Sequence, residues 1–141
     1  MVDILNKRRL LMLKAIVIIA IIGTVSKFFI TLSPVTWFDE QIHWYIAYGM
    51  VAYKLIELRI LYWLFIERAL MHLNNSNTTQ EHALKSMKRF FNLTPHGSTI
   101  FGLVTYKLTG VFTFFIVFMI IATITLYLAS PSKFSKDLKV V

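Results

Sequence analysis

The sequence predicts an all-α integral membrane protein with about three transmembrane helices and a short basic amphipathic helix at the membrane surface. Hydrophobic residues make up 57% of its 141 residues and charged residues 16%, against about 45–50% and 25% in soluble domains. A chain this short has too little interior to hide so much apolar surface, so lipid must cover it. The net charge of +8 is typical of a membrane protein that faces anionic lipid. We expect one membrane domain over 1–141.

The first span is predicted over 11–32, where the apolar run "AIVIIAIIGTVS" lies between Lys14 and Lys27. A lysine stem is long enough to carry its ammonium to the headgroups, so both lysines are expected to anchor the ends of the helix. The basic residues before the run resemble the start of a signal peptide. However, the apolar run is too long for a signal peptide, and no small-x-small cleavage site precedes Ser33-Pro34. We therefore expect the helix to remain in the mature protein.

The second span is predicted over 42–66. It follows a break at Ser33-Pro34 and the segment "VTWFDEQIHWY", whose aromatic residues are typical of a membrane surface. Asp39 is expected to be the N-cap. Because no helix-breaking residue follows before Asn74, the helix could extend over more than roughly thirty residues, or about 50 Å. Such a helix must tilt or project beyond a bilayer core of about 30 Å.

A cytoplasmic loop is predicted over 67–97, with a basic amphipathic helix at 82–91. The apolar residues of "HALKSMKRFF" share one helical face: Ala83, Leu84, Met87, Phe90 and Phe91. Lys85, Lys88 and Arg89 lie on the other face and are expected to contact the headgroups of anionic phospholipids. Packing on a partner protein is the alternative. The segment "NLTPHGST" is expected to end this helix, with Ser98 or Thr99 capping the next one.

The third span is predicted over 108–128, a stretch without any charged residue. Thr105, Thr109 and Thr113 repeat every fourth residue, with Gly110 beside them. This spacing predicts a ridge of small residues that lets another helix approach closely. Alternatively, the hydroxyl groups bond back to their own helix.

The distribution of lysine and arginine predicts a cytoplasmic amino terminus. Basic residues flank the first span and lie in the 67–97 loop, whereas none follows Lys27 before the second span. Three spans then place the carboxyl terminus outside, although Lys133, Lys136 and Lys139 follow the last span. This conflicts with the positive-inside rule. We expect a multi-pass protein of a bacterial inner membrane or of an organelle membrane.

The second span carries three charged residues, Lys54, Glu57 and Arg59. Its apolar residues contribute roughly −3 to −6 kcal/mol to insertion, whereas three central charges cost up to about 9 kcal/mol. The span should therefore not insert alone. Lys54 and Glu57 are three residues apart and are predicted to form an ion pair. Arg59 lies on nearly the opposite face, and we expect it to reach the cytoplasmic interface or to meet an acidic group of another chain.

Steps of four and three residues predict a packing seam on this helix. Its members are His43, Ala47, Met50, Lys54, Glu57, Leu61, Leu64, Arg68 and His72. Intramembrane charges often serve as an ion or proton relay, which makes Lys54 and Glu57 candidate transport groups. A relay needs further titratable groups at the same depth, and the other two spans offer none at the midplane. We therefore favour a role of the pair in docking within an assembly.

The sequence offers no catalytic, cofactor-binding or metal-binding site. The chain has no cysteine, which excludes disulfides and thiolate chemistry. Of its four histidines, only His43 lies near the outer surface, and the others lack the spacing of ligands on one helix. A glycine-rich phosphate loop, a Ser-His pair and a close pair of carboxylates are also missing. We predict that the protein is not an enzyme.

The leading hypothesis is a small accessory or structural subunit of a larger membrane complex of the respiratory or secretory type. Its partners would be other integral membrane subunits and anionic phospholipids, with no nucleic acid. One alternative is a small membrane protein that binds an invading membrane protein, as immunity or phage-exclusion proteins do. Another is a homo-oligomeric channel or transporter that uses Lys54 and Glu57.

Overall fold

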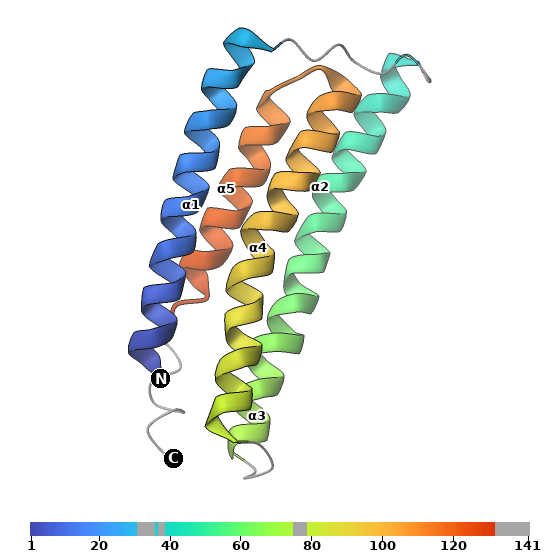
Figure 1. The fold of residues 1–141 in the computed structure, drawn as a ribbon. Coiled ribbons are helices and arrows are strands. Elements are labelled where there is room, and N and C mark those ends of the chain that lie inside the picture. Colours follow the sequence, from blue (N-terminus) through green and yellow to red (C-terminus); the bar gives the residue numbers. More distant parts are fainter. Residues whose placement is uncertain (31–35, 37–38, 75–78, 132–141) are drawn as a thin grey trace.

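The computed structural model describes residues 1–30, 36, 39–74 and 79–131, and its architecture is all-α with four long helices (Figure 1). The long helices are α1 (Val2–Phe29), α2 (Glu40–Tyr62), α4 (Gln80–Thr109) and α5 (Thr113–Leu128). A π-helical turn, Trp63–Glu67, joins α2 to the short helix α3, Arg68–Asn74. The all-α class predicted from the sequence is confirmed.

Successive long helices run in opposite directions (Figure 1). The helices α4 and α5 pack closely against each other, and both α1 and α2 pack against this central pair. With four alternating helices, α1 begins at the same end of the bundle at which α5 ends. We call this the basal end.

The long second helix predicted from the sequence is confirmed. Helical structure runs from Glu40 to Asn74 without a break, although the π turn interrupts its α-helical pattern. Asp39 occupies the N-cap position, and its side chain makes no capping hydrogen bond. Its backbone carbonyl instead accepts from the amides of Ile42 and His43 at 3.0 and 3.2 Å.

The helix break predicted at 92–99 is wrong, because α4 continues through Pro95 to Thr109. A proline inside a helix removes one backbone hydrogen bond and costs about 3 kcal/mol or more. Here, Pro95 is buried together with Phe90 and Phe91. Burial of these large side chains offsets the local preference for a break. Ser98 and Thr99 are therefore interior residues of α4 and not caps.

The predicted surface helix at 82–91 is likewise not a separate element but the beginning of α4. Its apolar face is buried in the core of the bundle, with Ala83, Met87, Phe90 and Phe91 all inaccessible to solvent or nearly so. The amphipathic pattern predicted for 82–91 is confirmed. Its apolar side packs against the other helices of the same chain, so the predicted loop 67–97 is mostly helical.

The predicted third span, 108–128, contains a turn that divides it. Gly110 has φ of 70°, a left-handed conformation that favours glycine. It ends α4, and α5 begins at Thr113. Three residues thus suffice to reverse the chain, which allows α4 and α5 to pack along their whole shared length.

Phe115 of α5 fills the junction of three helices. A Cβ atom added to Gly23 of α1 would lie 2.7 Å from its ring, and one added to Gly102 of α4 would lie 3.2 Å from its Cα. The missing side chains at the two glycines allow α1 and α4 to approach α5 closely. This contact fixes α1 on the central pair.

Among the described residues, α1 is the one helix that is both long and apolar enough to cross a membrane, and α5 is apolar but has 16 residues. The structure thus contains one candidate membrane-crossing helix, near the amino terminus. The predicted break at Ser33-Pro34, the aromatic residues Trp37 and Phe38 and the end of the first span at 32 lie outside the described residues.

Candidate functional site

The ion pair predicted between Lys54 and Glu57 is present on α2. Lys54 Nζ donates to Glu57 Oε2 at 2.9 Å. A separation of three residues places both side chains on one helical face. The Lys54 side chain is 0% exposed and that of Glu57 26%. The ammonium is therefore enclosed by protein, while its carboxylate partner reaches the surface.

The helix α4 closes over the buried ammonium. A Cβ atom added to Gly97 would lie 2.7 Å from Lys54 Nζ, so glycine leaves the space that the ammonium occupies. One turn along, the ring of Phe101 has its centroid 5.0 Å from Nζ, within the range of a cation–π contact. The hydroxyl group of Ser98 is buried without a hydrogen-bond partner in the described part of the chain. Lys54 thus joins α2 to α4 within one chain.

Gly97 and Phe101 were missed by reasoning from the sequence, because Gly97 lies inside the predicted break at 92–99 and Phe101 follows it closely. A usable signal was present in Ser98 and Gly102, two small residues four positions apart. Small residues at this spacing allow close helix packing, and both are buried on α4.

Arg59 finds its partner in its own chain. Its Nη1 donates to Glu67 Oε1 at 2.8 Å, and its guanidinium lies 5.7 Å from the centroid of the Tyr62 ring. The side chains of Arg59 and Glu67 are 69% and 35% exposed. The pair therefore forms on the outside of the helix, and no acidic group of another chain is needed.

The π turn at Trp63–Glu67 explains the unusual separation of eight residues between these partners. In an α-helix each residue advances by about 100°, so the eighth residue on lies about 80° around the helix. A π turn takes up one additional residue. Glu67 therefore stands where a seventh residue would, about 20° from Arg59.

The same additional residue shifts the packing seam. As far as Leu61, the predicted seam positions are buried or half-buried. Beyond the π turn, Ala69 and Leu73 are buried, each one position after a predicted member. The prediction that Arg68 belongs to the seam is wrong, because it is exposed.

The three threonines do not form a ridge on one helix. Thr105 and Thr109 lie in the last turns of α4, and Thr113 begins α5. The hydroxyl groups of Thr105 and Thr109 donate to the carbonyls of Phe101 and Thr105 at 2.7 and 2.9 Å. Both threonines thus bond back to their own helix, as the alternative interpretation stated.

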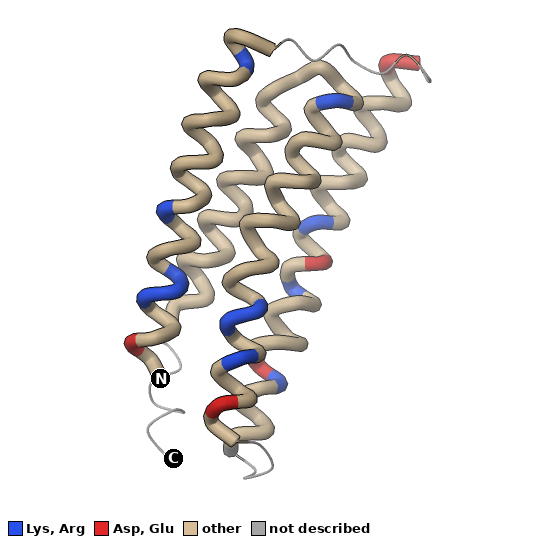
Figure 2. The backbone as a smooth tube through the Cα atoms, viewed as in Figure 1, with Lys and Arg blue, Asp and Glu red and all other residues tan. Residues whose placement is uncertain are grey.

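Lys85, Lys88 and Arg89 lie in the first turns of α4, next to the basic beginning of α1 (Figure 2). Lys85 and Arg89 are exposed and Lys88 is half-buried. None of the three pairs with a carboxylate in the part of the chain that the structure describes. These cations project from the bundle and are available to an external anion.

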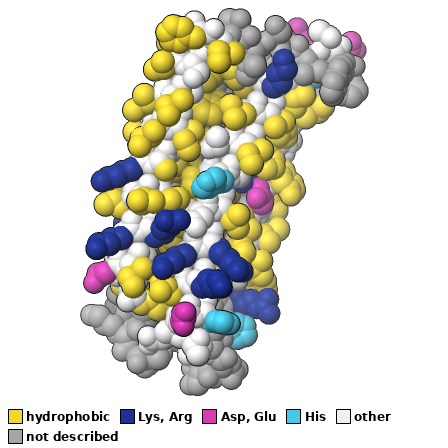
Figure 3. Space-filling model, viewed as in Figure 1, with side chains coloured by type: hydrophobic (Ala, Val, Ile, Leu, Met, Phe, Trp, Pro, Cys, Tyr) yellow, Lys and Arg dark blue, Asp and Glu magenta, His cyan; other side chains and the backbone are white. Residues whose placement is uncertain are grey.

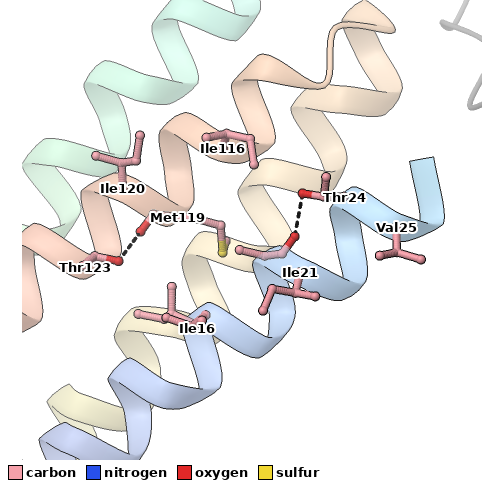
Figure 4. Close-up of a pocket in the computed structure, with 10 residues that line it drawn as sticks. Ile16, Ile21, Thr24, Val25, Ile116, Met119, Ile120 and Thr123 are labelled. Carbon is pink, nitrogen blue, oxygen red and sulfur yellow. Dashed lines mark hydrogen bonds between the residues drawn. The ribbon is translucent and has the colours of Figure 1, made fainter. Parts of the chain in front are cut away.

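An apolar groove of about 430 Å³ runs between α1 and α5 (Figure 4). It is lined by Ile16, Val17, Ala20, Ile21, Thr24, Val25, Ile116, Met119, Ile120 and Thr123. The hydroxyl groups of Thr24 and Thr123 donate to the carbonyls of Ala20 and Met119 at 2.8 and 2.9 Å. Because these donors are already used, the groove presents an almost entirely apolar surface.

Within the described residues, no group of three or more His, Asp or Glu side chains is arranged to hold a metal ion. No protein-family model, curated protein or solved structure matches this chain. The geometry of the bundle, its charged residues and its apolar surfaces are therefore the basis for a functional assignment.

Proposed function

We propose that the protein is a multi-pass membrane protein whose four long helices all enter the bilayer, and that it serves as a small accessory subunit of a larger membrane complex. The observation that carries this proposal is the outer surface of α1. Only 11% of its most apolar stretch of 18 residues is buried. Water penalises such a surface by about 25 cal/mol for each Å² exposed, so lipid or another transmembrane helix must cover it.

The enclosure of Lys54 supports membrane insertion of α2. A charge at the centre of a span is tolerated when it faces the interior of a bundle and is paired. Lys54 meets both conditions through Glu57 and Gly97. Arg59 and Glu67 pair toward the basal end of the helix, where their charges can reach the headgroups. The free-energy cost predicted for inserting α2 alone is therefore lower when α2 is part of the bundle.

The length of α5 is compatible with a span. Its 16 residues extend about 24 Å, somewhat less than a bilayer core of about 30 Å. Such a mismatch is accommodated by local thinning at a cost of fractions of a kcal/mol per Å.

Four spans also remove the conflict in the distribution of positive charge. Most basic residues of α1 and α4 lie toward the basal end, whereas Lys27 and Lys107 lie near the opposite end (Figure 2). The helix α5 also ends at the basal end. A four-span arrangement would therefore place Lys133, Lys136 and Lys139, which follow α5 in the sequence, on that side of the membrane. By the positive-inside rule the basal end is cytoplasmic. Both termini then face the cytosol, unlike in the three-span arrangement.

The groove between α1 and α5 is the proposed docking surface for a transmembrane helix of another subunit. Ala20, Thr24 and Thr123 are small, and transmembrane helices associate where small residues allow their backbones to approach. A transport role receives less support, because Lys54 is fully enclosed and neutralised within the chain. The proposal assigns no catalytic reaction to the protein.

Topology is tested by single cysteines, since the chain contains none of its own. We expect cysteines introduced by Ser76→Cys and Ser135→Cys to react with a membrane-impermeant maleimide only after the cells are opened. Labelling of Ser135→Cys alone in intact cells would restore the three-span arrangement. Labelling of Ser76→Cys from outside would reverse the proposed orientation.

The subunit role is tested by purification in mild detergent. We expect other membrane subunits to co-purify in fixed stoichiometry, and Thr24→Phe to reduce their recovery by blocking the groove. Ile18→Phe is the matched control, because Ile18 is an exposed residue of α1 that does not line the groove. A monomer would instead favour a small binding protein of the immunity type, and a symmetric homo-oligomer would favour a channel.

A further inference from the structure

The basal ends of α1 and α4 together form a basic surface that neither helix forms alone. On α4, Lys85, Lys88, Arg89 and Asn92 follow the spacing of one helical face. Asn92 Oδ1 accepts a hydrogen bond from Arg8 Nε of α1 at 2.7 Å. This bond shows that the basic face of α4 is turned toward the basic beginning of α1. In the space-filling view, the basic side chains of the two helices lie side by side (Figure 3).

The arginines of α1 retain hydrogen-bonding capacity at this surface. The bond to Asn92 uses one of the five N–H donors of Arg8. Arg9 Nε is buried and has no hydrogen-bond partner in the described structure. A guanidinium held at an interface with unused donors is suited to bind phosphate oxygens, often through two parallel bonds.

Cations outnumber carboxylates at this surface. Asp3 and Glu81 lie in the first turns of α1 and α4, whereas no aspartate or glutamate follows them between residues 4 and 29 or between 82 and 109. The cations therefore repel one another across the α1–α4 contact unless an external anion lies between them. This imbalance identifies the ligand as an anion.

Apolar side chains continue from the basic surface along the same two helices. Leu11 and Ile22 of α1 and Leu93 and Ile100 of α4 are exposed. A ligand with a phosphate headgroup and acyl chains fits a basic surface followed by an apolar one, whereas a nucleic acid or a free phosphate gains nothing from the apolar part. Basic sites between transmembrane helices on the cytoplasmic side are suited to lipid headgroups.

We infer that the basal α1–α4 surface is a binding site for an anionic phospholipid, whose phosphate is held by Arg8 and Arg9 from one side and by Lys88 and Arg89 from the other. This inference rests on the proposed insertion of the bundle in a membrane. The sequence predicted that the helix at 82–91 lies on the membrane surface. In the inferred site, one lipid instead binds between α1 and α4.

The test compares lipid binding by purified variants in neutral detergent micelles. Phosphatidylglycerol should raise the melting temperature of the protein, whereas phosphatidylcholine should not. The double change Arg8→Gln and Lys88→Gln should weaken phosphatidylglycerol binding by about tenfold or more, as expected for lost charge-assisted hydrogen bonds. Glutamine at position 8 preserves a donor for Asn92, and circular dichroism checks that the helices are retained.

Lys27→Gln with Lys107→Gln is the matched control, because it removes the same net charge from the opposite ends of α1 and α4. We expect this variant to bind phosphatidylglycerol like the unmodified protein. Equal loss of binding in the control would overturn the inference, since it would indicate general electrostatic attraction.

Three further outcomes would also reject the site. They are equal stabilisation by phosphatidylcholine, equal stabilisation by inorganic phosphate, and displacement of the lipid by a short RNA at comparable concentration. The measurement uses the purified protein without other subunits. If the lipid does not bind, the proposed subunit role is still tested by co-purification. If no other subunit co-purifies, the result of the lipid measurement still stands.

Discussion

Two ion pairs along the same helical segment have almost equal lengths and very different surroundings. Lys54 Nζ and Glu57 Oε2 are 2.9 Å apart, and Arg59 Nη1 and Glu67 Oε1 are 2.8 Å apart. The Lys54 side chain is completely enclosed by α2 and α4, whereas Arg59 lies mostly on the surface. Distance alone thus does not distinguish the two pairs.

The difference between them lies in what remains when one partner is removed. A charge left alone in an interior of low polarity retains its full desolvation penalty. A charge left alone at the surface is solvated by water or headgroups and is screened by salt. We therefore expect the inner pair to determine whether the bundle forms, and the outer pair to have little influence.

The largest effect is expected for Glu57→Leu, which leaves the enclosed Lys54 ammonium without its carboxylate. Breaking a buried pair costs about 3–5 kcal/mol. Lys54→Met should cost less, because the remaining carboxylate of Glu57 is partly exposed. Both values are measured as the free energy of unfolding in mixed micelles. If Lys54→Met is the more damaging change, the assignment of the enclosed charge is wrong.

A recovery in the double variant Lys54→Met with Glu57→Leu is the second prediction. Replacing both members of a buried pair with apolar residues is often neutral or stabilising. The double variant should therefore regain most of the stability and abundance lost in Glu57→Leu. A transport relay predicts instead that all three variants fold normally and all lack activity. A double variant as unstable as the worse single one would contradict the structural role of the pair in joining α2 to α4.

Gly97→Ala should destabilise the bundle by about 1–3 kcal/mol, the usual cost of overpacking. The added Cβ would lie 2.7 Å from Lys54 Nζ, so the ammonium would have to move away from its site. Gly49→Ala is the matched control, because a Cβ there meets no atom within 4 Å. Alanine at that helical position should be neutral or stabilising by up to about 1 kcal/mol. Thermal unfolding of the two variants in parallel provides the comparison.

The smallest effect is expected for Arg59→Gln and for Glu67→Gln, at no more than about 1 kcal/mol each. The exposed ion pair contributes little to stability despite its short distance, because water solvates the two charges almost as well when they are apart. Raising the salt concentration should reduce even this difference. An effect of several kcal/mol would show that the outer pair is enclosed by a partner in the functional state.

The sequence was sufficient for features that depend on local spacing. The separation of Lys54 and Glu57 predicted their contact, and the absence of helix breakers between Glu40 and Asn74 predicted the long second helix. Both predictions follow from the local geometry of the α-helix, which does not depend on the neighbouring helices.

Three features that depend on packing between helices were not predicted. Pro95 suggested a break, because its local cost is apparent from the sequence while the burial of Phe90 and Phe91 against other helices is not. Gly110 was taken for a packing residue and proved to be the turn between α4 and α5. The register shift at Trp63–Glu67 has no simple sequence signal, so Glu67 was not recognised as the partner of Arg59.

The turn at Gly110 has a consequence for the order in which the bundle assembles. Closing a connection of three residues costs little chain entropy, and contacts between segments close in sequence form early. The helices α4 and α5 should therefore pair first, as a hairpin, and α2 and α1 should join it later. If the bundle is inserted in a membrane as proposed, this order brings the polar residues of α4 into it together with the apolar α5. The buried lysine of α2 then meets a partner helix that is already in place.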